Sequence, residues 1–455
     1  MAVSARKRIW GWYFFDWASQ PYNTLLLTFI FGPYFAQVAT AHFAGQGLGP
    51  EAASAAAQSY WAKGLTISGF FIAVMAPILG AIADASGRRM RWIWFFSVWY
   101  VVGAWGLWFL SPDATSLFWA VAWFGIGLIG MEFTTIFTNA QLPDLASRDE
   151  VGRVSGSGFA FGYLGGILAL VIMLTLFAES ATTGKTLTGG APLFGLDPAA
   201  REGTRAVGPF TAIWYALFMI PFFLWVREVP RGSGRIDLGA AFRDLAALIA
   251  SLFRRGSLSA YLASSMFYRD ALNALYGFGG VYEVGMLHWI NTKIRVFAIV
   301  SANAAAVDAW IGGQADKRLG PKPVIVWSTV ILIGVCIVIV GMTRDGIFGL
   351  PFAEGSAMPD YIFYACGVLI GAAGGTIQAS SRTMMVYHTT PARAAEAFGL
   401  FALSGKATAF LAPALIAVAT DLTGNQRMGI SPLILLFGVA LILMIWVRPY
   451  GEKEV

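Results

Sequence analysis

The sequence predicts an all-α membrane protein of twelve transmembrane helices, arranged as two six-helix pseudo-repeats. Of the 455 residues, 57% are hydrophobic and only 12% are charged, whereas soluble proteins carry about 25% charged residues. The apolar residues gather in stretches of roughly 20, the length at which a helix crosses ~30 Å of hydrocarbon. A polar loop of similar composition also occurs twice, half a chain apart, which indicates a duplication.

The expected spans follow one another along the chain, each separated by a short polar segment. They are residues 10–40, 60–83, 92–111, 117–141, 153–178, 209–227, 258–284, 294–315, 323–342, 359–387, 396–420 and 430–448. The sixth and seventh spans are joined by a basic segment with an amphipathic stretch at 238–253, which we expect to lie on the membrane surface. The predicted domains are an N-terminal six-helix bundle (1–227), a cytoplasmic linker (228–256) and a C-terminal six-helix bundle (257–455).

The repeated loop joins the second span to the third and the eighth span to the ninth. Its first copy is GAIADASGRRMR (80–91) and its second is GGQADKRLGPK (312–322). In both copies glycines permit close packing or tight turns, an aspartate ends one helix, and basic residues follow. The matching positions are Gly80, Asp84, Gly87 and Arg88 in the first copy and Gly312, Asp316 and Gly320 in the second.

Charge and composition exclude several classes of protein. The net charge of +6 reflects topology: segments on one side hold 21 of the 31 Lys and Arg residues and the opposite loops hold seven, which places both termini in the cytoplasm. No nucleic-acid partner is therefore expected. The two cysteines lie inside apolar spans and the three histidines lack ligand spacing, so neither a disulfide nor a metal site is expected. We find no nucleophile with a base and no phosphate-binding loop, and expect neither enzymatic activity nor a cofactor.

Charged side chains inside the spans are expensive and mark functional candidates. In the first half, Asp16 lies about 10 Å inside the first helix and shares a face with Asn23, and Pro21 is expected to bend the helix there. Glu132 lies near the middle of the fourth span. A structural hydrogen bond to a neighbouring helix is the alternative role for Asp16.

The second half carries a larger set of deep polar residues. Arg269 and Asp270 are adjacent, so their side chains point about 100° apart and should serve different partners. The other members are Asn273 in the seventh span, Asp308 in the eighth, Gln378 and Arg382 in the tenth and Lys406 in the eleventh. Close packing between the tenth and eleventh spans is the alternative explanation for the glycines beside them.

The repeated loop resembles the signature between helices 2 and 3, and again between 8 and 9, of major facilitator superfamily transporters. Ala85 replaces a basic residue of the signature, and the second copy has one extra residue. FDWASQPYN in the first helix, RDALNALYGFGGVY in the seventh and QASSRTMMVYHTTPARAAEAFGLFALSGKAT (378–408) resemble the vacuole-effluxer branch. That branch groups bacterial permeases with fungal autophagy-related exporters of vacuolar amino acids.

The resemblance implies a secondary transporter that works by alternating access in the inner membrane of a bacterium. We expect a monomer in the lipid bilayer that moves a small polar solute, with an amino acid first and sugars, peptides, peptidoglycan fragments or organic anions as alternatives. A non-transporting receptor or scaffold on the same fold is the alternative class. The four deep acids outnumber the three deep bases, so one carboxylate is a candidate proton carrier. The expected roles are substrate binding for Asp16, Asn23, Arg269, Asp270, Asn273, Gln378, Arg382 and Lys406, proton coupling for Glu132 or Asp16, and gating for the loop residues.

Overall fold

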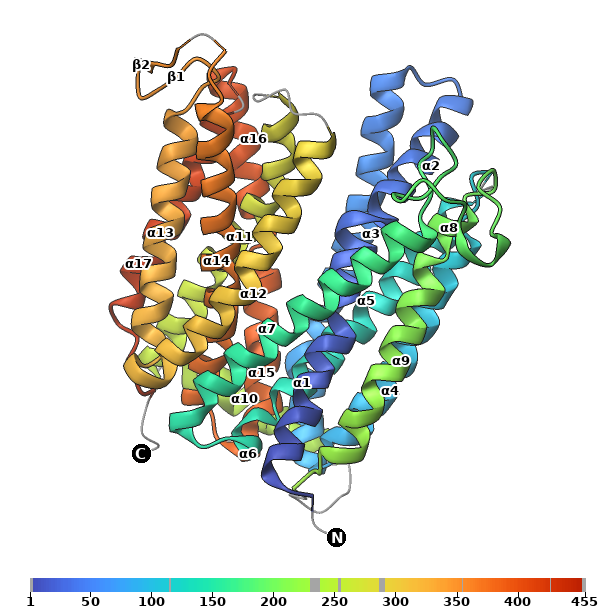
Figure 1. Ribbon diagram of the computed structural model, residues 1–455. Coiled ribbons are helices and arrows are strands. Elements are labelled where there is room, and N and C mark those ends of the chain that lie inside the picture. Colours follow the sequence, from blue (N-terminus) through green and yellow to red (C-terminus); the bar gives the residue numbers. More distant parts are fainter. Residues whose placement is uncertain are drawn as a thin grey trace. The chain divides into compact units, whose positions relative to one another are not determined.

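The structure, a computed structural model, describes residues 3–113, 116–229, 238–252, 255–285, 291–353, 355–425 and 427–451. Within these ranges the chain is mostly helical (Figure 1). The strands of this part of the chain form one short hairpin, β1 (Gly346–Ile347) with β2 (Leu350–Pro351). The predicted fold class, an all-α membrane protein, is confirmed.

The chain divides into two compact units. Unit 1 comprises Met1–Met75, Gly87–Asn139 and Phe161–Gly234, and unit 2 comprises Ala76–Ser86, Ala140–Ala160 and Arg235–Val455. The units follow the expected halves except that two segments of the first half belong to unit 2. The division into two six-helix domains and a linker therefore stays a prediction.

Unit 1 is a bundle filled by aromatic side chains. Its helices are α1 (Ala5–Pro21), α2 (Phe31–Gly45), most of α3 (Pro50–Ser86), α4 (Arg89–Gly106), α5 (Leu117–Asn139), the end of α7 (Arg148–Ile172), α8 (Glu202–Arg205) and α9 (Val207–Trp225). The ring of Tyr100 stacks on that of Tyr215 with centroids 3.8 Å apart. The Tyr215 hydroxyl also shares a 2.8 Å hydrogen bond with Ser97, so this buried ring keeps a partner for its polar end.

The first span is interrupted rather than continuous. α1 ends at Pro21, a π-helical segment runs over Tyr22–Phe29, and the backbone leaves helical geometry at Ile30 before α2 begins. Pro33 has no N–H to donate to the carbonyl of the residue four positions earlier, which explains why the α-helix is interrupted here. The bend predicted beside Pro21 stays a prediction, because the backbone keeps helical angles at Pro21 and Tyr22 and departs from them at Ile30.

Unit 2 contains the rest of the chain's helices. They are α6 (Leu142–Leu145), the start of α7, α10 (Leu238–Leu252), α11 (Gly256–Gly285), α12 (Asn291–Leu319), α13 (Pro321–Gly341), α14 (Met358–Tyr387), α15 (Ala394–Ala407), α16 (Leu411–Thr423) and α17 (Ser431–Met444). α14 packs along α12 and α13, and α17 packs along α11. A side chain at Gly371 or Gly375 of α14 would collide with backbone carbonyls of α12, so these glycines let the two helices approach closely.

The helices match the expected spans. Within the described residues, nine helical stretches are long and apolar enough to cross a membrane. The spans expected at 258–284, 294–315 and 430–448 coincide with α11, α12 and α17. The expected amphipathic stretch forms α10, and its place on the membrane surface stays a prediction.

Candidate functional site

The end of α3 packs against the first turn of α15 inside unit 2. The Asp84 carboxylate accepts a hydrogen bond from the backbone N–H of Glu396 (2.8 Å). A side chain at Gly80 would collide with the carbonyl of Ala395, so glycine is required for this approach. A carboxylate at a helix N-terminus pairs with unsatisfied N–H groups and with the positive end of the helix dipole. Asp84 therefore anchors the start of α15.

The remainder of the first loop forms the turn into α4. Gly87 has a positive φ of 64°, a conformation that glycine adopts at little cost. Arg88 is exposed and precedes the first residue of α4. These two residues thus shape the turn that ends one helix and starts the next.

The second loop copy makes an analogous contact. Asp316 is 1% exposed, and its Oδ1 accepts a hydrogen bond from the Ser380 hydroxyl (2.8 Å). Gly312 lies against Thr376 of α14, where a Cβ would collide with that side chain. Gly320 has a φ of 81° and caps α13. Both copies therefore combine a helix contact with a glycine turn, although their aspartates bind different kinds of donor and only Asp316 is fully buried.

The start of α7 completes this end of unit 2, which we call the signature end because Asp84 and Asp316 both lie in it. Arg382 of α14 is buried and donates to the hydroxyl oxygen (2.9 Å) and the carbonyl oxygen (2.8 Å) of Ser155. Arg148 donates to the carbonyl of Tyr387 (2.9 Å). These bonds hold the start of α7 against α14.

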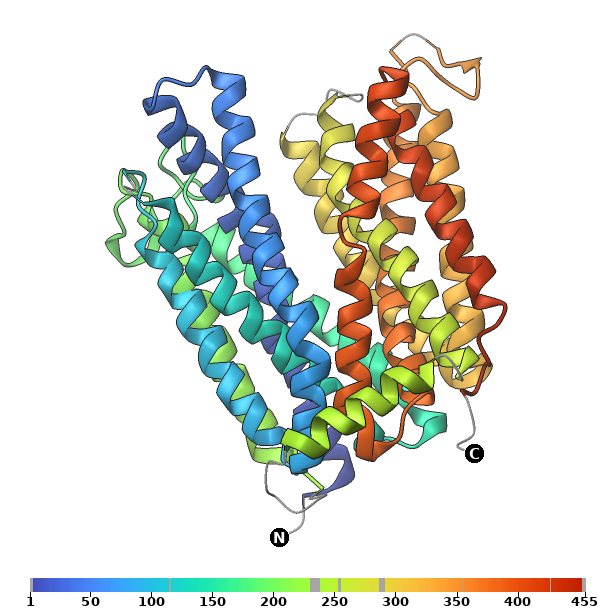
Figure 2. The same ribbon diagram turned by 180° about the vertical axis from the view of Figure 1, so that it is seen from behind.

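The eleventh span is interrupted like the first. α15 ends at Ala407, residues 408–410 form a turn, and α16 begins at Leu411, as the orange-red ribbon of Figure 2 shows. Pro413 explains the interruption, because it cannot donate to the carbonyl of Ala409 and its ring excludes a straight helix there. Interrupted helices free backbone groups inside a membrane, and such groups commonly line binding sites.

Arg269 and Asp270 of α11 bind to opposite sides of this interruption. Arg269 donates to the carbonyl of Phe401 in α15 (2.7 Å), and its guanidinium lies 4.2 Å from the centre of the Phe401 ring. The Asp270 carboxylate accepts from the N–H of Ala412 in α16 (2.9 Å). The expectation that these neighbours serve different partners is confirmed.

The remaining predicted residues of unit 2 lie on α11, α14 and α15. Lys406 is half-buried in the last turn of α15, next to the interruption. Gln378 donates to the carbonyl of Gly374 one turn earlier in α14 (3.2 Å), and Asn273 is exposed on α11. Arg269, Asp270 and Lys406 are thus gathered around residues 408–410, whereas Arg382 contacts α7 at the signature end. Their roles in substrate binding stay predictions.

The predicted residues of unit 1 lie on α1 and α5. Asp16 is partly buried, and Gly162 of α7 packs against it, leaving 3.1 Å between an ideal Cβ at 162 and the Cβ of Asp16. Asn23 lies in the π-helical segment, where its carbonyl accepts from the Thr28 hydroxyl (2.8 Å). Glu132 is half-buried in α5. The proton-coupling role assigned to Asp16 and Glu132 stays a prediction.

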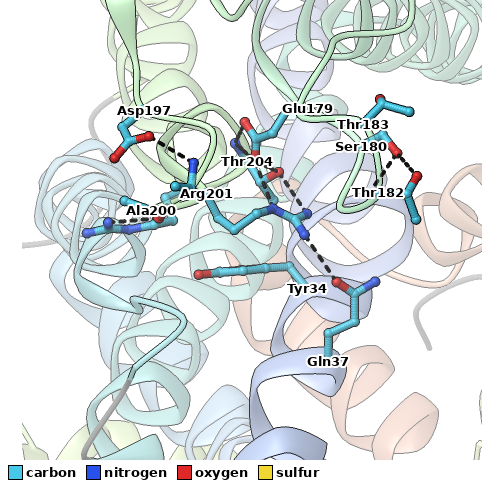
Figure 3. Close-up of polar contacts among 12 residues, drawn as sticks. Tyr34, Gln37, Glu179, Ser180, Thr182, Thr183, Asp197, Ala200, Arg201 and Thr204 are labelled. Carbon is cyan, nitrogen blue, oxygen red and sulfur yellow. Dashed lines mark hydrogen bonds and ion pairs between the residues drawn. The ribbon is translucent and has the colours of Figure 1, made fainter.

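Sequence reasoning missed a buried ion pair in the long segment between α7 and α9. The Glu179 carboxylate, with no exposed area, accepts from Arg201 Nε (2.8 Å), from the Thr204 hydroxyl (2.7 Å) and from the Thr204 N–H (3.1 Å) (Figure 3). Arg201 also lies over the ring of Tyr34 in α2. Nothing in the local pattern links residues 22 positions apart in a loop. In the part of the chain described here, no group of three or more His, Cys, Asp or Glu residues could hold a metal ion.

The fold is that of the major facilitator transporters. The structure resembles the human organic anion transporter MFSD10 with a TM-score of 0.67 and 16% identity, over 97% of this chain and 99% of that one. It resembles the fucose:proton symporter FucP of E. coli equally well, with a TM-score of 0.67, 16% identity, and 97% and 98% of the two chains covered. The proton:xylose symporter XylE gives a TM-score of 0.66 at 12% identity, over 97% and 95%.

Within that class the chain belongs to the family described as vacuole effluxer Atg22 like, whose model matches residues 4–451. It is 25% identical to the MFS-type transporter YxiO of Bacillus subtilis, over 98% of this chain and 96% of that protein. It is 23% identical to autophagy-related protein 22 of Cryptococcus neoformans over 61% of this chain, and the match spans 47% of that longer protein. The family resemblance and the absence of an enzymatic role expected from the sequence are confirmed by these relatives.

Proposed function

We propose that the chain is a secondary active transporter that moves a small polar solute, first of all an amino acid, by proton-coupled alternating access. The observation that carries this proposal is the gathering of Arg269, Asp270 and Lys406 around the interrupted eleventh span. Charges of both signs inside a membrane are costly and are retained for function. A site with both signs suits a zwitterion, whose ammonium and carboxylate groups each need a partner.

Relatives and structural neighbours support the solute class in different ways. Members of this family are described as vacuole effluxers, which agrees with export of an amino acid. FucP and XylE are described as proton symporters of sugars, which supports proton coupling and keeps a sugar as the second candidate. Peptides, peptidoglycan fragments and organic anions are further outcomes of the same assay.

The contacts at the signature end support a gating role for the two loops. Asp84 and Asp316 bind helix α15 and helix α14, respectively, and opening this end requires such contacts to separate. In the proposed topology this end faces the cytoplasm, both termini are cytoplasmic, and the protein works as a monomer in a bacterial inner membrane.

Reconstitution into liposomes tests the proposal. Purified protein is screened with labelled amino acids and labelled sugars, with and without an imposed pH gradient. Accumulation of one class above protein-free liposomes, stimulated by the gradient, is the expected result. Saturable binding without accumulation of any solute would instead support a receptor, and gradient-independent equilibration would reject proton coupling while keeping transport.

A further inference from the structure

Two loops of the chain share a short sequence that lies outside the duplicated signature loops. Residues 193–196 read LFGL in unit 1, and residues 347–350 read IFGL in unit 2. The first tetrapeptide lies in the long segment between α7 and α9, and the second forms the tip of the β1–β2 hairpin between α13 and α14 (Figure 1). Neither takes part in the signature end or in the charged centre around residues 408–410.

Both tetrapeptides form a turn with the same uncommon backbone. The two central residues have a positive φ in each turn, 62° and 70° at Phe194 and Gly195, and 49° and 82° at Phe348 and Gly349. Glycine adopts such angles at little cost, but a β-carbon opposes them, so turns of this kind favour asparagine or aspartate at the first central position. Three non-glycine residues of the described chain have a positive φ, and two of them are these phenylalanines. Each turn therefore holds a phenylalanine where its backbone favours a small polar residue.

The rings of the two phenylalanines are exposed. Phe194 is 86% exposed and Phe348 is 60% exposed. Other large apolar side chains of the same loops are exposed as well, namely Leu187 and Leu193 in the first loop and Leu350 in the second. The strained backbone is thus not compensated by burial of the ring inside the protein. An apolar medium outside the protein would supply that burial.

Each ring lies beside the end of a helical stretch that is long and apolar enough to cross a membrane. The centre of the Phe194 ring is 6.0 Å from that of Phe177, the last residue of the stretch that contains α7. The Phe348 ring lies against Gly341, the last residue of α13, where a Cβ would collide with the ring. The end of a span lies at the boundary between lipid and water, where aromatic side chains are enriched. The lipid around each span therefore extends to the ring beside its end.

We propose that the two phenylalanine–glycine turns, residues 193–196 and 347–350, are interfacial anchors that insert Phe194 and Phe348 into the bilayer at its headgroup boundary. The partner is lipid because each exposed ring adjoins the end of a span. In the proposed topology, α7 and α13 begin on the cytoplasmic side, so the turns at their far ends enter the opposite leaflet. The anchors act whether or not the chain moves a solute.

Spin labels placed singly on the two turns test the anchors in nanodiscs of phosphatidylethanolamine and phosphatidylglycerol. The full chain, with the buried Cys336 and Cys366 replaced by alanine, is labelled through Phe194→Cys or through Phe348→Cys. Molecular oxygen concentrates in lipid whereas a nickel chelate stays in water, so the ratio of their collision rates with the label measures its depth. We expect both labels to favour oxygen and to lie about 5–10 Å into the boundary between headgroups and acyl chains.

Exposed polar positions of the same loops are the matched controls. Labels introduced through Lys185→Cys in the first loop and Asp345→Cys in the second should collide mainly with the nickel chelate. A label at Phe194 or Phe348 that behaves like its control would overturn the anchor of that loop. Protection from both reagents would show that protein covers the turn and would overturn the assignment to lipid. Should Phe348→Cys not fold, Leu350→Cys on the same turn takes its place.

The contact between Phe348 and Gly341 gives a second test that keeps the ring. With the label introduced through Leu350→Cys, Gly341→Ala should push the ring away from the end of α13 and move the label toward water. Gly334→Ala adds the same methyl group to α13 where it would meet no neighbouring atom within 4 Å, and it should leave the depth unchanged. Equal label depths in the two variants would overturn the role of this contact in placing the ring.

Phe194→Asn compares the strain of the turn with its contact to lipid. Asparagine accepts a positive φ more readily than phenylalanine, and this exposed ring has little protein contact to lose, so a turn in water would become no less stable. The anchor predicts the opposite, a lower unfolding temperature in nanodiscs, whereas Phe194→Trp should retain the parent value because tryptophan suits the interface. An unfolding temperature of Phe194→Asn equal to or above that of the parent would overturn the anchor of unit 1.

Discussion

Arg382 and Ser155 are joined by two hydrogen bonds, one to the serine hydroxyl oxygen (2.9 Å) and one to its carbonyl oxygen (2.8 Å). The Ser155 hydroxyl in turn donates to the carbonyl of Ala379 (2.8 Å). The ring of Phe159 lies 4.3 Å from the guanidinium carbon. The flat guanidinium therefore has both its edge and its face occupied by α7.

We expect Arg382→Lys to destabilise the protein, because an ammonium cannot reproduce a planar two-bond contact with ring stacking. Hydrogen bonds to charged groups contribute about 1.5–3 kcal/mol each, so a clear fall in the thermal unfolding temperature is expected. Arg318→Lys, at an exposed position, is the control. Unchanged stability together with a tenfold loss of solute binding would instead support a role for Arg382 in substrate binding.

Asp316 should control the rate of transport rather than solute affinity. Asp316→Asn keeps the acceptor for Ser380 while removing a buried charge, so the closed packing of Asp316 on α14 is favoured and turnover slows. Initial rates over a range of solute concentrations measure this, with exposed Asp421→Asn as control. An affinity loss above tenfold with a normal maximal rate would contradict the gating role.

Proton coupling is predicted to depend on Glu132 or Asp16. Glu132→Gln and Asp16→Asn remove the ionisable group while keeping its shape, and at least one should abolish accumulation driven by a pH gradient. Solute exchange without a gradient should persist in the same variant. Asp113→Asn, at an exposed position, serves as control. Intact gradient-driven accumulation in both variants would show that another group carries the proton.

Truncation of the Lys406 side chain is predicted to weaken solute binding. Lys406→Ala removes a half-buried cation beside the interrupted helix, and loss of a charge-assisted hydrogen bond of about 1.5–3 kcal/mol corresponds to a roughly 10- to 150-fold weaker affinity. Lys63→Ala removes an exposed lysine of α3 and should be neutral. Equal affinities of the two variants would assign Lys406 to structure.

The Glu179 and Arg201 pair is predicted to stabilise unit 1 without taking part in transport. Glu179→Ala leaves the Arg201 guanidinium and the Thr204 N–H without their acceptor, and breaking such a buried pair costs about 3–5 kcal/mol. Thermal unfolding measures the loss, and exposed Lys185→Ala in the same segment is the control. A normal unfolding temperature with altered transport would contradict this structural role.

Much of the fold could be predicted because the membrane makes local sequence decisive. A span must bury its own backbone hydrogen bonds, so length and hydropathy alone locate each helix. Pro21 was expected to bend the first span for the same local reason, but the backbone leaves helical geometry at Ile30, before Pro33. Pro413 offered a similar local signal for the interruption of the eleventh span. Arg269 and Asp270 were expected to diverge because helical geometry sets the angle between neighbours.

Local sequence patterns could not predict which groups the deeply placed charged side chains bind. Asp270 binds an N–H 142 residues away, and Arg382 binds a serine 227 residues away. Such pairs depend on how separate helices pack, which no local periodicity encodes. The sequence by itself determined the spans, the duplicated loop and the residues able to carry charge into the membrane. Only the tertiary structure decided that Arg269 binds the carbonyl of Phe401 within α15 and that Asp270 binds the N–H of Ala412 at the start of α16. The physical reason is that a deep charge must take its partners from other helices, and a helix start offers an N–H that its own helix leaves unsatisfied.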